Sequence, residues 1–201
     1  MRIYIFTFFL IFAALFSQTA CSRTEEPTTA NKNAPVQPTI EQRSEITKTV
    51  NAEPKARLKS QANEISQTLE NGNYDKLADL THPKVLEMSG GREKMIAASK
   101  EVMDVTKKQG IEIVSTEVGE PNDFVPVGKE LFSTVPFTAV LKMPNGKVKQ
   151  ESMVVAISGD NGANWKFVNG INQEKFQEMF PDAAGKIQIP EQSAPVPVKD
   201  K

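Results

Sequence analysis

The hydrophobic residues in the middle of the chain recur at helical spacing. Four of them follow Pro54 at intervals of four, three and four: Leu58, Ala62, Ile65 and Leu69. This spacing places them on one face of an amphipathic helix. Pro54 can occupy the first turn of such a helix, and Asn71-Gly72 can end it. The pattern therefore predicts a helix over 54–71 that packs on a core.

Weaker helical patterns follow this segment. We expect a short helix that turns Tyr74, Leu77 and Leu80 inward, and the residue before Pro83 ends it because that position disfavours helix. Pro83 can start another helical turn, and a longer helix is predicted over 92–109, up to Gly110. Near the C-terminus, Asn172 can cap a final short helix that carries Phe176, Met179 and Phe180 and stops at Pro181.

From residue 111 the hydrophobic period changes from 3.6 to 2, which is typical of strands. Strands are predicted over 111–118, 135–143, 148–158 and 165–168, and Asn145-Gly146 indicates a hairpin between the second and the third. Residues 124–130 are interpreted as a loop or an irregular edge, and Pro136 indicates an edge position or a bulge. Helices followed by an antiparallel meander predict an α+β fold.

The N-terminal segment has the features of an export signal. Residues 3–16 form an uncharged apolar run after Arg2, too short for a bilayer span of about 20 residues. The small Ala20 directly before Cys21 resembles the lipobox of bacterial lipoproteins, which implies a lipid-modified Cys21. Ser22 after it resembles the outer-membrane sorting pattern. The alternative is a signal peptidase cut after Ser22, which discards an unmodified cysteine.

The pattern divides the chain into four parts. Residues 1–20 are predicted to be a signal peptide, and 21–52 a flexible tether that follows the lipidated cysteine. This tether contains three prolines and few large apolar residues, so it cannot bury enough surface to offset the entropy of ordering. The folded α+β domain is expected over 53–182, and residues 183–201 form a Pro-rich tail.

Composition excludes several function classes. Lys and Arg total 24 and Asp and Glu total 25, with no dense basic run, so no nucleic-acid partner is predicted. The single cysteine cannot form an internal disulfide. One histidine and one cysteine do not supply the ligands of a zinc site, and the loop at 160–164 lacks the acidic spacing of a calcium loop. We predict no metal and no cofactor.

Several segments together resemble the nuclear-transport-factor-2-like superfamily, which includes ketosteroid isomerase and the SnoaL-like cyclases. They are the helix at 54–71, the segment 73–77, the segment 90–96, and the terminal Trp165-Lys166-Phe167-Val168-Asn169-Gly170. The resemblance covers 54–181. It implies helices on a strongly curved sheet that together form a cone with a pocket, and a sheet that often serves as a dimer interface. A cystatin-like arrangement of one helix on a sheet is the alternative.

The candidate catalytic residues lie around the only histidine. His82 can act as a general base if a carboxylate orients it, and Asp79 and Asp75 lie nearby in the sequence. Tyr74 is the only tyrosine after the signal. These residues support an isomerase-like or cyclase-like enzyme as the alternative function. The structural interpretation of His82 is a turn residue that bonds to backbone before Pro83.

Non-catalytic binding is the preferred function. The odd positions from 135 to 143 are all apolar, so this face of the sheet offers no acid or base. The candidate residues for binding an apolar ligand come from this face, from the flexible, polarizable methionines and from the tryptophan. They are Phe137, Leu141, Met103, Met153 and Trp165. We therefore predict a lipoprotein anchored to the envelope, with outer-membrane sorting favoured, that binds an apolar small molecule or a protein partner. The sheet is also a candidate interface for a homodimer.

Overall fold

The computed structural model of the chain describes residues 40–198, with side chains from residue 53 onward. Cys21 and the predicted signal lie outside the described residues. Four helices come first: α1 (Ile40–Asn71), α2 (Tyr74–Leu80), α3 (Pro83–Met88) and α4 (Arg92–Lys108). The later elements are β1 (Glu112–Val118), β2 (Val125–Val127), β3 (Glu130–Met143), β4 (Gly146–Ser158), β5 (Lys166–Val168), α5 (Gln173–Met179), the 3-10 helix η2 (Pro181–Ala183) and β6 (Val196–Val198). This order confirms the predicted α+β class.

The first helix is longer than the sequence pattern predicts. α1 begins at Ile40, so Pro54 lies inside the helix and not in its first turn. At that position proline cannot donate a backbone hydrogen bond to the preceding turn. Its ring packs closely against Gly162, where an added Cβ would lie 2.7 Å from the Pro54 Cβ. Gly162 also has a φ of +85°, so both the close approach and the left-handed backbone require glycine there.

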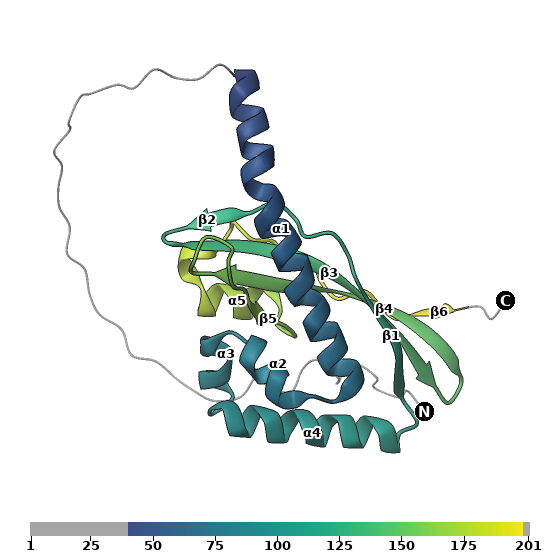
Figure 1. Cartoon of the computed structure of the whole chain (residues 1–201). Helices are drawn as coiled ribbons and strands as arrows, with labels where there is room; N and C mark the ends of the chain where they lie inside the picture. Colours follow the sequence, from purple (N-terminus) through teal and green to yellow (C-terminus); the bar gives the residue numbers. More distant parts are fainter. Residues whose placement is uncertain (1–39, 199–201) are drawn as a thin grey trace.

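The strands form one curved antiparallel sheet of six strands within the described residues (Figure 1). The order is β1-β3-β4-β5, with β2 paired to β3 and β6 paired to β4. β3 and β4 pair from Leu131↔Ser158 to Met143↔Gly146. The predicted hairpin at Asn145-Gly146 is confirmed, with Pro144-Asn145 between the last paired residues. β1 carries a bulge between Ile113 and Ser115.

The sheet is covered on both faces. On one face, Val154 and Ala156 of β4 pack in a cluster with Leu58, and we call this set the α1 cluster. Its other main members are Ala62, Ile65, Val135, Phe137 and Trp165. The alternate residues of β4, Val155 and Ile157, pack in the α5 cluster with Phe132, Phe176, Phe180 and Ile187. Figure 1 shows α1 crossing one side of the sheet while α5 lies on the other.

One expectation for the strands is confirmed and one needs correction. Of the two alternatives for 124–130, the structure shows the edge: β2 pairs only with the start of β3, through Val127↔Glu130. Pro136 lies in β3 between two neighbours and not on an edge strand. The pairing of β1 with β3 ends at Phe137, and the carbonyl of Pro136 accepts from Gly119 N at 2.8 Å. Proline is tolerated because its missing N–H points beyond the end of β1.

The segment after residue 182 contributes to the fold. Ile187 is 3 % exposed and belongs to the α5 cluster. The chain then returns along β4, where the Gln150 side chain donates to the carbonyl of Ser193 at 2.8 Å. β6 finally pairs with Lys147–Lys149 at the far end of β4. The predicted Pro-rich tail at 183–201 therefore includes two core residues, Ala183 and Ile187, and one strand.

Replacing Leu58 by alanine tests whether α1 is anchored through the α1 cluster. Leu58 is 0 % exposed, so the change removes buried methyl groups and leaves a cavity. We expect the free energy of unfolding to fall by about 2–5 kcal/mol, measured by urea unfolding. The control is Val114→Ala at the exposed β1 bulge, where Val114 is 50 % exposed and the expected loss is below about 0.5 kcal/mol. Equal losses in the two variants would contradict this role of Leu58.

Candidate functional site

His82 lies in the turn that joins α2 to α3. Its backbone N–H donates to the carbonyl of Phe167 at 2.9 Å, which ties the turn to β5. Its Nδ1 accepts from the backbone N–H of Lys84 at 3.2 Å and so caps α3. The ring lies edge-on to Phe180, with centroids 5.1 Å apart. The cap fixes the ring as an acceptor at Nδ1, so the neutral ring carries its proton on Nε2.

The surroundings of His82 keep it uncharged at neutral pH. Burial lowers its pKa to about 4, and the nearby cations Lys84 and Lys166 add to this effect. His82 is 9 % exposed, which explains why desolvation is the largest cause. Among the side chains of residues 53–198, no carboxylate hydrogen-bonds to its ring. The contacts of His82 are therefore those of a buried helix cap.

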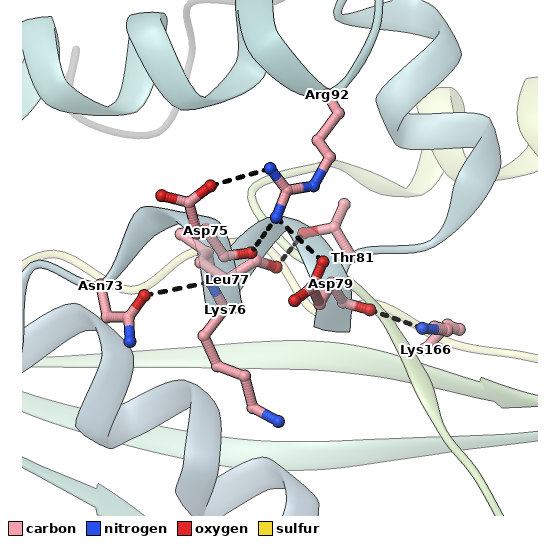
Figure 2. Close-up of polar contacts among 8 residues, drawn as sticks. All are labelled: Asn73, Asp75, Lys76, Leu77, Asp79, Thr81, Arg92 and Lys166. Carbon is pink, nitrogen blue, oxygen red and sulfur yellow. Dashed lines mark hydrogen bonds and ion pairs between the residues drawn. The ribbon is translucent and has the colours of Figure 1, made fainter.

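The carboxylates of Asp75 and Asp79 contact Arg92 and not His82. Figure 2 shows the guanidinium group of Arg92 between the side chains of Asp75 and Asp79. Arg92 Nη1 lies 2.8 Å from Asp75 Oδ1, and Nη2 lies 3.0 Å from Asp79 Oδ1. Nη2 also donates to the backbone carbonyl of Asp75 at 3.0 Å. The carboxylates thus join α2 to the start of α4, and each is more than half exposed.

Tyr74 stands at the start of α2, directly after the N-cap Asn73. Burial raises the pKa of its hydroxyl, and the nearby charge of Asp104 raises it further. The four candidate catalytic residues therefore come from one stretch of chain but do not form one hydrogen-bonded group. His82 bonds to α3 and β5, whereas Asp75 and Asp79 bond to α4.

The structure brings together only two of the five residues predicted to bind an apolar ligand. Phe137 and Trp165 both belong to the α1 cluster, where they are 7 % and 1 % exposed. Trp165 stacks on Phe124 at 5.3 Å and donates from Nε1 to the carbonyl of Gly162 at 3.2 Å. Met153 pairs with Pro136, and strand alternation places it on the opposite face from Phe137. The remaining two, Leu141 and Met103, lie half-buried towards the hairpin end of β3 and on α4.

A cleft that the sequence did not indicate opens on the α5 side of the sheet. Its volume is about 420 Å³, and three parts of the chain enclose it: the β2–β3 hairpin, the start of α3, and the segment from Phe180 to Lys186. Phe132 and Phe180 form its buried aromatic floor, 1 % and 4 % exposed. The hairpin reaches over this floor through the turn Gly128-Lys129, where Gly128 has a φ of +61°. The sequence carries one signal for this hairpin. Gly128 occupies the first turn position, between the two valines of β2 and the apolar residues near the start of β3.

Four charged side chains line the same cleft: Lys84, Glu130, Asp182 and Lys186. Lys84 Nζ donates to the carbonyl of Met179 at 2.7 Å and lies 4.5 Å from the centroid of the Phe180 ring. Within residues 53–198, the side chains of Glu130, Asp182 and Lys186 make no hydrogen bond or ion pair. The cleft therefore combines an apolar floor with charges of both signs that have no partner of opposite sign.

The carboxylate of Asp160, in the loop after β4, is bonded within that loop and to the end of β4. The Asp160 carboxylate accepts from the backbone N–H of Asn164 at 2.8 Å, from its side chain at 2.7 Å, and from Ser158 Oγ at 2.8 Å. These bonds lower the pKa of Asp160 to about 2, those from Asn164 most of all. Among the described residues, no three His, Cys, Asp or Glu side chains gather closely enough to hold a metal ion.

Comparison with known proteins adds no family assignment. No protein-family model matches the chain, and a comparison with curated proteins gives no match either. Between residues 40 and 198, no helix has the length and apolar character needed to cross a bilayer.

Replacing His82 by asparagine tests the pKa of the buried ring. Asparagine is also a good N-cap, so α3 keeps a capping side chain while the titratable group is lost. The folded-state pKa of about 4 lies below the usual 6.5, so the unfolded chain binds more protons between these values. The free energy of unfolding of the unmodified protein should therefore fall on acidification through this window, by up to about 1.4 kcal/mol per pH unit.

Urea unfolding at about pH 7, 6 and 5 measures this slope. The His82→Asn variant should lose less stability over the same range, whatever its stability at neutral pH. The two proteins differ only at residue 82, so the contributions of all other groups cancel in the comparison. Equal slopes would show that His82 has the same pKa in the folded and unfolded states, which would contradict the prediction.

Proposed function

We propose that the protein is a lipid-anchored binding protein of the bacterial envelope, and that its ligand site is the cleft between the β2–β3 hairpin, α3 and η2. The ligand is a small molecule with an apolar part. The anchor is Cys21, which follows an uncharged apolar run and a small residue. Such a protein is exported and held at a membrane, with the outer membrane favoured by Ser22.

The main support for a ligand site is the cleft itself. Its volume of about 420 Å³ lies within the range of small-molecule sites, roughly 300–1,000 Å³. Such sites combine apolar side chains with a few polar groups, and this cleft is lined by apolar residues together with charged ones. Phe132 and Phe180 are held edge-on, 5.7 Å between centroids, so the floor is preorganised by the α5 cluster.

The alternative enzyme function has weaker support. An isomerase-like or cyclase-like mechanism needs His82 and a carboxylate that converge on one cavity. The Nδ1 atom of His82 is used as a helix cap, and Asp75 and Asp79 are both bonded to Arg92. These contacts favour binding without catalysis.

The proposal also includes a fold family and an oligomeric state for the protein. A curved antiparallel sheet with α1 packed across one face supports a fold of the nuclear-transport-factor-2-like type. The α1 cluster fills the space between α1 and the sheet with buried side chains, so we place the ligand on the other face. The hairpin end of β3, with half-buried Leu141 and Met143, is the part of the sheet available for a homodimer.

The lipid anchor is tested by intact mass and membrane fractionation of the native protein and a Cys21→Ala variant. We expect a membrane-bound chain that begins at Cys21 with a mass increment of two or three acyl chains. One chain alone binds a bilayer only marginally, whereas two or more hold the protein firmly. The variant should lose both the increment and the membrane association. A soluble, unmodified native chain beginning at Arg23 would refute the anchor.

The ligand cleft is tested by filling it. Lys186→Trp places a large ring in the cleft, and Lys129→Trp is the control because Lys129 lies in the hairpin turn but does not line the cleft. The probes are benzoate, benzylamine and 3-phenylpropanol, titrated by calorimetry into the full chain in dodecyl maltoside. At least one should bind with a dissociation constant on the order of 1 mM, a value typical of weak fragment binding.

Binding should disappear in Lys186→Trp and persist in Lys129→Trp. Thermal unfolding of both variants confirms that they remain folded. Binding that survives the filling of the cleft, or no binding of any probe, would refute this site.

A further inference from the structure

The side of β4 that faces away from β3 is paired along only part of its length. β5 pairs with it at residues 155–157, and β6 pairs with it at residues 147–149. Among the described strands, none pairs with this side of β4 between those two points. We call residues 147–154 on this side the β4 edge. Where such an edge is open, its backbone N–H and C=O groups can pair with another chain.

β6 covers the β4 edge with few contacts of its own. It has three residues, and Val196 and Val198 are 55 % and 37 % exposed. The segment that leads to it, residues 190–195, is exposed throughout. The Gln150 side chain fastens this segment by donating to the carbonyl of Ser193 at 2.8 Å. Because β6 buries so little apolar surface, it belongs to the parts of the fold that open most easily.

Pro197 makes β6 an end to the sheet. It lies opposite Val148, and proline lacks the N–H that a further strand would need. Proline is tolerated in an edge strand where the missing N–H points away from the partner strand, so the outer side of β6 has no donor at its central residue. β6 therefore covers the β4 edge without offering an equivalent edge in its place.

The β4 edge beneath this cover is complementary to itself in charge. Lys149 and Glu151 lie on the same face of the strand, with Lys149 Nζ 2.6 Å from Glu151 Oε1. If two copies of β4 pair antiparallel about Gln150, Lys149 of each copy lies opposite Glu151 of the other. Two-fold symmetry gives this match twice, and opposite charges that face each other across strands stabilise the pairing. Registers centred on Lys149 or Glu151 place like charges opposite each other.

We propose that β6 is a blocking strap, which keeps the β4 edge from pairing with the β4 edge of a second copy of this chain. Release of β6 lets two sheets join through residues 147–153. The release is local, because Ile187 and Ile189 still pack in or against the α5 cluster when the chain opens after them. This surface is separate from the ligand cleft, so the inference does not depend on the proposed function.

The test removes the strap by ending the otherwise full chain after Ile189. The protein mass of the native and truncated chains is measured in dodecyl maltoside by size exclusion with light scattering, after subtraction of the detergent. The mass of the native chain is the baseline. We expect the truncated chain to form particles of twice that mass as its concentration rises, because its β4 edge is open.

Charge reversals in the truncated chain test the register. Glu151→Lys brings positive charges together at both matched positions, and it should return the mass to the baseline. Lys149→Glu should do the same with negative charges, and the two substitutions combined should restore the doubled mass. Glu117→Lys is the control, because Glu117 lies on β1 and not on the β4 edge. It should leave the doubled mass unchanged.

A second variant releases the strap without shortening the chain. Val196 lies opposite Lys149, and its N–H points to the other side of β6 from the missing N–H of Pro197. Val196→Pro therefore removes a donor that faces β4, and it should also double the mass. Thermal unfolding shows which variants are folded, and the full-length variant decides the question if the truncated chain unfolds.

Two results would overturn the strap. The first is a folded, released chain that keeps the baseline mass at every concentration, since its open edge would then have no affinity for a second copy. The second is a doubled mass that survives both single charge reversals, since the two copies would then join through another surface.

Discussion

The burial of four successive residues in β4 determines the rest of the structure. Residues 154 to 157 are all at most 2 % exposed: Val154, Val155, Ala156 and Ile157. Because successive side chains of a strand point to opposite faces, such a segment needs a cover on both sides. α1 supplies one cover through Leu58 and its neighbours, and α5 with η2 supplies the other. The C-terminal elements are therefore part of the core, and the cleft exists because the second cover ends beside the β2–β3 hairpin.

Strong periodicity made much of the fold predictable. The spacing of Leu58, Ala62 and Ile65 predicts the buried face of α1, and Asn145-Gly146 predicts the central hairpin. The errors in the predicted strands arose where the sequence signal was weak or short. β2 and β6 have three residues each, and both contain proline, which argues against a strand when sequence is considered alone. Their pairing depends on an existing edge of β3 or β4, and that edge forms only in the folded sheet.

The candidate site was less predictable because long-range contacts assemble it. Lys84, Glu130 and Lys186 are far apart in the sequence, and each resembles an ordinary surface charge when considered singly. His82 attracts attention because it is the only histidine, yet a histidine before proline can also cap a helix. What decides between these roles is the position of Phe167, Phe180 and Lys166 around it. The sequence does not place those residues near His82.

Phe180 connects the buried histidine to the cleft. One side of its ring meets the edge of His82, and Lys84 Nζ lies over the ring while it bonds to the carbonyl of Met179. Lys84 also donates its backbone N–H to His82, so the α3 cap, the cation and the aromatic floor share one set of contacts. A charged His82 ring would place a second cation beside Lys84 and against this floor. The low pKa of His82 therefore keeps its ring uncharged beside Lys84 and the Phe180 ring at neutral pH. A buried cap can in this way support a ligand site that it does not line.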